Sequence, residues 1–134
     1  KEATANMDRQ LQLIEQVGED AIAYLSGDDF TVLPYIACGG HGVISVIANI
    51  APRQMKELVA LARSGEVAKA RAKQAAMARV NRVMFVESNP GPVKAALHMM
   101  GKIGPEIRLP LVAPSNESLA KIRDAITAYG LVKA

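Results

Sequence analysis

The first half of the chain alternates helix-like and strand-like segments, and this alternation limits the folds that it can adopt. Two short apolar runs, residues 21–26 and 42–46, are typical of buried strands. Patterns with helical spacing surround these runs, at residues 6–17, at 31–38 and from Pro52 onward. Helices that alternate with strands predict βα units built on a parallel sheet.

The second half of the chain predicts helices almost throughout. Its apolar residues recur at the spacing of one helical face. Ser115 is a predicted N-cap, and Gly65 and Gly101 are predicted to end helices. The predicted helices cover residues 66–84, 92–100 and 116–129.

Two or three parallel strands do not form a complete sheet, because their edges would lie open. A (β/α)₈ barrel needs about 250 residues, so a chain of 134 residues can hold about half of one. We therefore predict an α/β fold, the C-terminal portion of a (β/α)₈ TIM barrel with a C-terminal helical appendage. Residues 1–64 would form the last βα units, and residues 65–134 the helical region. The N-terminal half of the barrel would lie in a longer polypeptide.

The composition argues against several classes of function. Only 4% of the residues are aromatic and the net charge is +3, so neither base stacking nor phosphate attraction predicts a nucleic-acid partner. No apolar run approaches the roughly 20 residues that span a bilayer, so no membrane segment is expected. A single cysteine fits a reducing compartment and predicts a cytoplasmic protein.

Lys1 is the first candidate for chemistry. At the end of a barrel strand its side chain would point into the mouth, where barrel enzymes have their active sites. A lysine amine there can form a Schiff base with a keto acid, provided that burial or nearby positive charge lowers its pKa from about 10.4. The alternative is a solvated surface lysine.

Two polar turns are further candidates. Gly27, Asp28 and Asp29 follow a predicted strand, so they belong to the same mouth. Glycine lets a ligand approach the backbone closely, while the aspartates could position a polar substrate or cap the next helix. Residues 87–92 form a fixed corner with two prolines, and Asn89 is a candidate to reach the active site.

A glycine-rich turn and a cysteine–histidine pair predict no site. Residues 39–42 precede a strand, whereas a phosphate-binding loop follows one, so we interpret them as a helix-to-strand turn. Cys38 and His41 are three residues apart, but no further ligands follow at metal spacing, so we predict no metal.

Taken together and in order, the motifs resemble those of the dihydrodipicolinate synthase family of pyruvate-dependent class I aldolases. The resemblance covers the whole chain. Two of its motifs, GHGVISV and FVESNPGPVK, are more specific to this family than the others. The matching segments are KEAT at 1–4, SGDD at 26–29, GGHGVISVIAN at 39–49, FVESNPGPVKAAL at 85–97 and RLPLVAPS at 108–115.

This resemblance implies roles for four residues. Lys1 would form the Schiff base with pyruvate, whose enamine would then attack the aldehyde of aspartate semialdehyde in lysine biosynthesis. Ile44 would lie beside pyruvate and present its carbonyl, Gly27 would form part of the pocket wall, and Asn89 would lie near the pocket. No cofactor is implied beyond the covalent pyruvate imine on Lys1, and the expected assembly is a homotetramer.

The family's carboxylate-binding threonines, relay tyrosine and aldehyde-binding arginine would all lie upstream of Lys1. We therefore expect residues 1–134 alone to be inactive and to need the N-terminal half of the barrel as a partner. Two alternatives stay open. One is a sister pyruvate-dependent lyase or aldolase that acts on a sugar acid, and the other is a non-catalytic helical interaction fragment.

Overall fold

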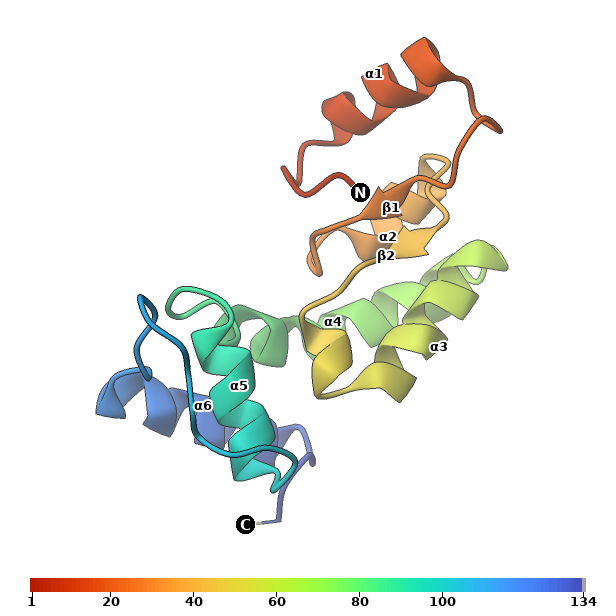
Figure 1. Cartoon of the computed structure of the whole chain (residues 1–134). Helices are drawn as coiled ribbons and strands as arrows, with labels where there is room; N and C mark the ends of the chain where they lie inside the picture. The colour runs from red at the N-terminus through yellow and green to blue at the C-terminus, as the bar shows by residue number, and fades with distance from the viewer. Residues whose placement is uncertain (134) are drawn as a thin grey trace.

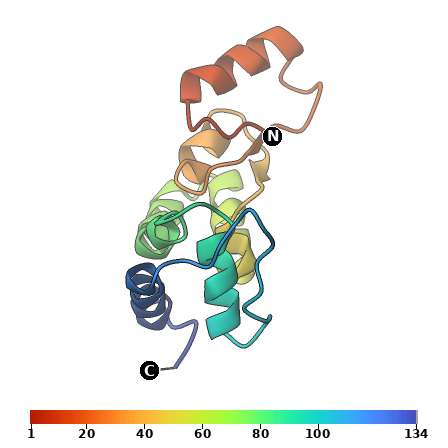
Figure 2. The same ribbon diagram turned by 60° about the vertical axis from the view of Figure 1, so that its left-hand side comes forward.

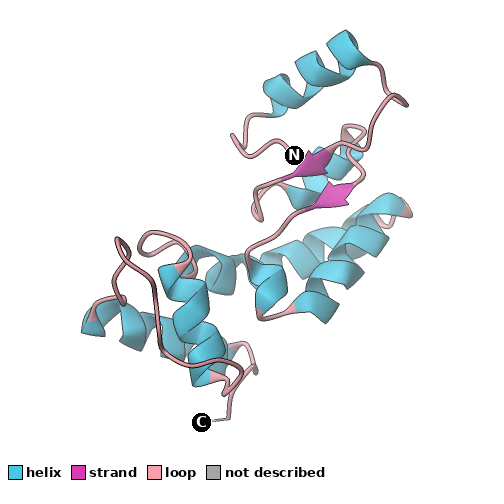
Figure 3. Ribbon diagram, viewed as in Figure 1, coloured by secondary structure: helices cyan, strands magenta, loops and turns pink. Residues whose placement is uncertain are grey.

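The computed structural model describes residues 1–133, and helices make up most of this part of the chain (Figure 3). The order of elements begins with α1 (Met7–Val17), β1 (Leu25–Ser26), α2 (Val32–Ala37), β2 (Gly42–Val43), the short 3₁₀ helix η1 (Ile47–Asn49) and α3 (Pro52–Arg63). The elements that follow are α4 (Val67–Val83), α5 (Gly91–Met99) and α6 (Asn116–Ala128) (Figure 1). The predicted alternation of helix and strand in the first half is confirmed.

The two strands are parallel, and they are shorter than the sequence predicts. β1 and β2 pair over two residues each, with Leu25 opposite Gly42, whereas the predicted strands cover residues 21–26 and 42–46. Glu2 adds an isolated parallel bridge to β1. Backbone groups form a ladder only where a partner strand runs alongside, and the hydrogen bonds between these two segments extend only from the His41 N–H to the Tyr24 carbonyl and from the Ile44 N–H to the Ser26 carbonyl.

The helix ends that the sequence predicts lie within about one residue of the observed ends. Asn6 caps α1, because its Oδ1 accepts hydrogen bonds from the N–H groups of Asp8 and Arg9. Ser115 caps α6, because its Oγ accepts a hydrogen bond from the Ser118 N–H at 3.3 Å. Capping is chemistry between near neighbours in the sequence, so it was predictable without the rest of the fold.

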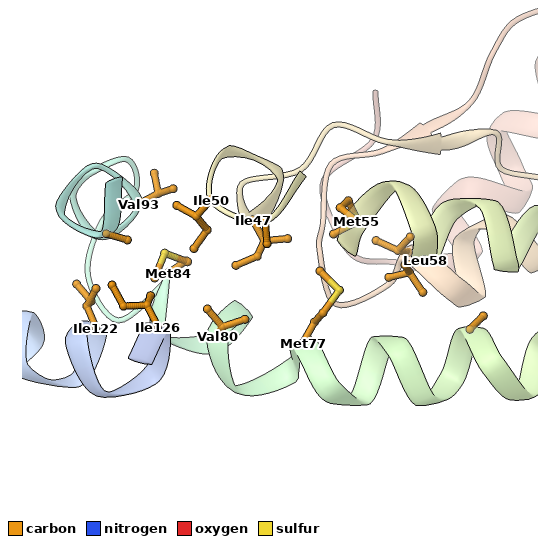
Figure 4. Close-up of a cluster of buried hydrophobic side chains, with 14 of the residues drawn as sticks. Ile47, Ile50, Met55, Leu58, Met77, Val80, Met84, Val93, Ile122 and Ile126 are labelled. Atoms are coloured by element: carbon orange, nitrogen blue, oxygen red, sulfur yellow. The ribbon is translucent and has the colours of Figure 1, made fainter. Parts of the chain in front are cut away.

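The hydrophobic core lies between the helices and not on the sheet. Ile47 and Leu58 from the first half are fully buried, as are Met77, Val80 and Ile126 from the second half. Figure 4 shows these side chains between η1, α3 and α5 on one side and α4 and α6 on the other. The core thus contains side chains from both halves of the chain, and it anchors η1 through Ile47.

The elements follow one another along the molecule, with α1 at one end and α6 toward the other (Figure 2). The small sheet lies between α1 and the helical core, so the segments that lead into and out of the strands are held from one side by packed helices. Among the described residues, none of the helices combines the length and the apolar character needed to cross a membrane.

Glu87 connects the turn after α4 to the start of α6. Its Oε1 accepts hydrogen bonds from the Ser115 N–H at 2.9 Å and from the Ser115 Oγ at 2.8 Å. Hydrogen bonds from Ser118 and Ser115 lower the pKa of the Glu87 carboxyl from its usual value of 4.5. The ionised form is therefore the one that stabilises this corner.

We expect acid to weaken this connection. A carboxyl whose pKa is lowered by folding stabilises the protein above its unfolded pKa, and this stability is lost as the pH falls through the folded value. When the pH is lowered below about 4.5, the melting temperature should thus decrease. The Glu87→Gln variant should show a smaller decrease. Circular dichroism melts across this range measure the effect. Glu19→Gln, at an exposed position outside the corner, is the control, and identical pH profiles for both variants would contradict the expectation.

Candidate active site

Lys1 lies at the edge of the sheet, next to β1. The following residue holds it there, because the Glu2 N–H donates to the Leu25 carbonyl at 2.9 Å and the Glu2 carbonyl accepts from the Gly27 N–H at 2.6 Å. On the opposite edge of β1, the Ile44 N–H donates to the Ser26 carbonyl at 2.8 Å. Three parallel segments therefore bring Lys1, Gly27 and Ile44 to one region of the sheet.

A hollow of about 260 Å³ opens at this region, and all four predicted site residues line it. Lys1 supplies its amine, Gly27 and Ile44 come from the ends of the two strands, and Asn89 comes from the turn before α5. The structure thus brings together residues that are up to 88 positions apart in the sequence (89 − 1).

The hollow also contains residues that the sequence analysis missed. Its remaining lining residues are Ser45, Val46, Asn49, Pro90, Val93, Lys94 and Leu97. All of them lie inside the motifs GGHGVISVIAN and FVESNPGPVKAAL, so the motifs themselves were the available signal. Lys94 is the most informative addition, because it is half-buried and gives the hollow a second cationic side chain.

Gly27 is required by the close approach of the Lys1 segment. A Cβ atom at position 27 would lie 2.6 Å from the Cε of Lys1 and 2.5 Å from the Cβ of Ala3. It would also lie 3.1 Å from the Ala3 Cα, a backbone atom that cannot move away as a side chain can. Glycine is thus the residue that lets the Lys1 side chain cross the end of β1.

Asp29 has a role that neither sequence interpretation described. It caps η1 rather than the next helix, because its Oδ2 accepts hydrogen bonds from the N–H groups of Val46 at 3.0 Å and Ile47 at 3.1 Å. Thr31, the N-cap of α2, makes no capping hydrogen bond with its side chain. Nor does Asp29 line the hollow; it lies behind the wall that Ser45 and Val46 form.

The Asp29 carboxyl is 1% exposed. Burial raises its pKa from the usual value of 3.8, and the neighbouring charge of Asp28 acts in the same direction. Hydrogen bonds from Ser45, Ile47 and Val46 oppose this shift. The wall of the hollow is therefore hydrogen-bonded to a buried carboxyl group. The backbone N–H groups of the wall offset part of the cost of burying its charge.

The remaining sequence candidates have structural roles. Residues 39–41 form the predicted turn between α2 and β2, and Gly39 needs its glycine because its φ is +91°. His41 packs against Tyr24, and its Nδ1 accepts a hydrogen bond from the Tyr24 N–H at 3.2 Å. In residues 1–133, no group of three or more histidine, cysteine, aspartate or glutamate side chains is placed to hold a metal ion.

A larger and more apolar cavity of about 500 Å³ lies where α5, α6 and residues 105–114 meet. It contains none of the four predicted residues, and Lys94 lines both cavities. The smaller hollow is the better candidate for an active site, because it combines the Lys1 amine with the strand ends of a parallel sheet.

Comparison with known proteins decides the family. The model of the dihydrodipicolinate synthetase family matches residues 1–129. The chain belongs to this family. It is 74% identical over 131 residues to the 4-hydroxy-tetrahydrodipicolinate synthase of Anaeromyxobacter sp. (strain K), covering 98% of this chain and 44% of that protein. It is 52% identical over 132 residues to the synthase of the same name from Maridesulfovibrio salexigens, covering 98% of this chain and 45% of the relative.

Solved structures agree with this family. The crystal structure of dihydrodipicolinate synthase from Aquifex aeolicus superposes with a TM-score of 0.95 at 41% identity, and the match covers 100% of this chain and 46% of that one. The structure of dihydrodipicolinate synthase from Thermotoga maritima gives 0.92 at 39% identity, with 98% and 45% covered. The chain thus spans a little less than half the length of the relatives that it matches.

Proposed function

We propose that the chain is the C-terminal portion of a (β/α)₈ barrel enzyme, a 4-hydroxy-tetrahydrodipicolinate synthase that condenses pyruvate with aspartate semialdehyde. The observation that carries this proposal is the hollow that gathers Lys1, Gly27, Ile44 and Asn89 at the strand ends. Membership of the family and a relative at 74% identity support the choice of reaction. A cytoplasmic location and assembly as a homotetramer belong to the same proposal.

In this reaction the Lys1 Nζ, once deprotonated, attacks the C2 carbonyl carbon of pyruvate. The resulting carbinolamine takes up a proton and loses water to become a protonated imine, whose positive charge makes the C3 protons acidic. Loss of one C3 proton gives an enamine, and its C3 attacks the aldehyde carbon of the second substrate. The amino group of that substrate then displaces Lys1 from C2, so the free amine is regenerated and the product ring closes.

The lining of the hollow suits the first of these steps. Lys94 can attract the pyruvate carboxylate, since charge-assisted contacts to a carboxylate are strong. Val93 and Leu97 provide an apolar side that excludes water around the imine. The backbone at Ile44 forms the opposite wall, where its carbonyl can accept a hydrogen bond from bound substrate.

The same lining supports the proposal that a partner half is needed. Among the described residues, the hollow is lined by no aspartate, glutamate, histidine or tyrosine. The proton transfers at C3 and at the aldehyde oxygen each need an acid or base within hydrogen-bond reach. We propose that the N-terminal half of the barrel supplies these groups.

The test uses the full-length polypeptide of which we propose this chain to be a part. Pyruvate followed by borohydride should leave a reduced adduct that peptide mapping places on Lys1. Turnover with aspartate semialdehyde should then exceed turnover with sugar aldehydes. An adduct on Lys1 with faster turnover of a sugar aldehyde would identify a sister lyase. No adduct at all would favour the helical interaction fragment.

Gly27→Ala should sharply reduce adduct formation in this polypeptide. The added methyl group would push the Lys1 segment away from β1, and misplacing a reacting group by about 1 Å can cost about 10²-fold in rate. Quenching the reaction with borohydride at successive times, and measuring the amount of reduced adduct, gives the rate at which the imine forms. Gly42→Ala is the matched control, because position 42 lies in β2 of the same sheet and its Cβ would meet only the Leu25 Cδ2 at 3.5 Å. Equal rates in the two variants would contradict the proposed path of Lys1.

A further inference from the structure

The wall of the hollow opposite Lys1 is held at two points. At its start, the Ile44 N–H donates to the Ser26 carbonyl at 2.8 Å. At its end, the N–H groups of Val46 and Ile47 both donate to one carboxylate oxygen, the Oδ2 of Asp29, at 3.0 and 3.1 Å. Residues 44–46 line the hollow between these two points, so their position depends on both.

Asp29 is itself fixed by α4. Its backbone carbonyl accepts hydrogen bonds from the Gln74 Nε2 at 2.8 Å and from the Asn81 Nδ2 at 3.3 Å. Asn81 is 1% exposed, and Gln74 also accepts a hydrogen bond from the Leu33 N–H through its Oε1. A continuous set of hydrogen bonds therefore runs from α4, through Asp29, to the wall of the hollow.

We propose that Asp29 is a positioning residue for the reaction at Lys1, and that its carboxylate holds residues 44–47 against the substrate. This inference rests on the proposed function. The Val46 N–H is part-buried and the Ile47 N–H is buried, and both need an acceptor, since leaving such groups unpaired is costly. Without the carboxylate, the segment would move toward another acceptor and carry Ile44 and Ser45 away from the substrate. No atom of Asp29 needs to touch the substrate in this role.

The geometry also says which replacements should be tolerated. Only Oδ2 is used by the two N–H groups, and Oδ1 has no hydrogen-bond partner in the structure. An asparagine whose amide oxygen takes the place of Oδ2 therefore keeps both hydrogen bonds. A leucine has a similar size, but it has no acceptor and leaves both N–H groups unpaired. Asp29→Asn and Asp29→Leu thus separate the acceptor from the volume of the side chain.

The test measures kcat/KM for pyruvate in the full-length polypeptide, per site trapped by borohydride, so that unfolded molecules do not count. We expect Asp29→Leu to lose about 10²-fold, as is typical when a reacting group is misplaced. Asp29→Asn should stay within about threefold, because it loses charge assistance but keeps both hydrogen bonds. Ile126→Val is the matched control: it destabilises the helical core, where Ile126 is fully buried, without touching the wall.

The outcomes are distinct. A kcat/KM for Asp29→Leu that equals that of Asp29→Asn would overturn the inference, as would a loss no larger than that of Ile126→Val. No pyruvate adduct in the unsubstituted polypeptide would overturn the proposed function and this inference with it. If Asp29→Leu does not fold, Gln74→Ala takes its place, because it removes the shorter bond to the Asp29 carbonyl. Its kcat/KM should fall by more than that of Ile126→Val, and an unchanged kcat/KM would overturn the inference.

Discussion

Replacing Lys1 with arginine in the full-length polypeptide should abolish the pyruvate adduct and lower kcat by about 10³-fold or more, because the reaction loses its covalent path. Arginine keeps the positive charge and much of the length of lysine. Its guanidinium does not lose a proton at working pH, so it cannot attack a carbonyl. Lys1→Arg therefore removes the nucleophile while keeping a long side chain with a basic group in the hollow.

The measurement is the mass of the protein after incubation with pyruvate and borohydride, followed by peptide mapping. Lys94→Arg is the control, because it changes the other lysine of the same hollow in the same way. The adduct should persist on Lys1 in that variant, although weaker pyruvate binding should raise KM. An adduct on Lys94 in the Lys1→Arg variant would contradict the proposal that Lys1 forms the Schiff base.

The sequence predicted best those features that depend on near neighbours. Asn6 and Ser115 cap helices through N–H groups two or three residues away, so the residue types alone located the helix starts. The strands were predicted too long, because the extent of a ladder depends on segments distant in the sequence. A run such as 42–46 is apolar enough for a strand, yet only its first two residues are in a strand here.

In the candidate site, too, motifs within the sequence were predictable, whereas a contact between distant residues was not. The resemblance of motifs named Lys1, Gly27, Ile44 and Asn89, and the structure places all four around one hollow. The contact between Asp29 and Val46 spans 17 residues and crosses from one βα unit to the next. No local pattern distinguishes an aspartate that caps a helix beginning three residues later from one that caps a more distant segment. This role became visible only when both strands were in place.

The isolated chain, residues 1–134, should fold as helices but show no turnover of pyruvate and aspartate semialdehyde. Its fully buried core lies among α2, α3, α4, α5, α6 and η1, so the side chains that form it come from helices and not from the sheet. Among the described residues, the hollow is lined by no aspartate, glutamate, histidine or tyrosine, so the proton transfers of the proposed reaction should need the N-terminal half.

Mixing residues 1–134 with an N-terminal half of the barrel should restore turnover. The N-terminal segment of the Anaeromyxobacter synthase, whose matching part is 74% identical to this chain, can be produced separately and combined with residues 1–134. We expect circular dichroism to show helices in residues 1–134 alone, and turnover to appear only in the mixture. Residues 1–134 with Lys1→Arg, mixed in the same way, control for activity of the added segment. Turnover by the isolated chain at the rate of the mixture would contradict the need for a partner half. It would also mean that Lys1 forms and releases its imine without any acid or base beyond those of this hollow, which general acid–base chemistry makes unfavourable.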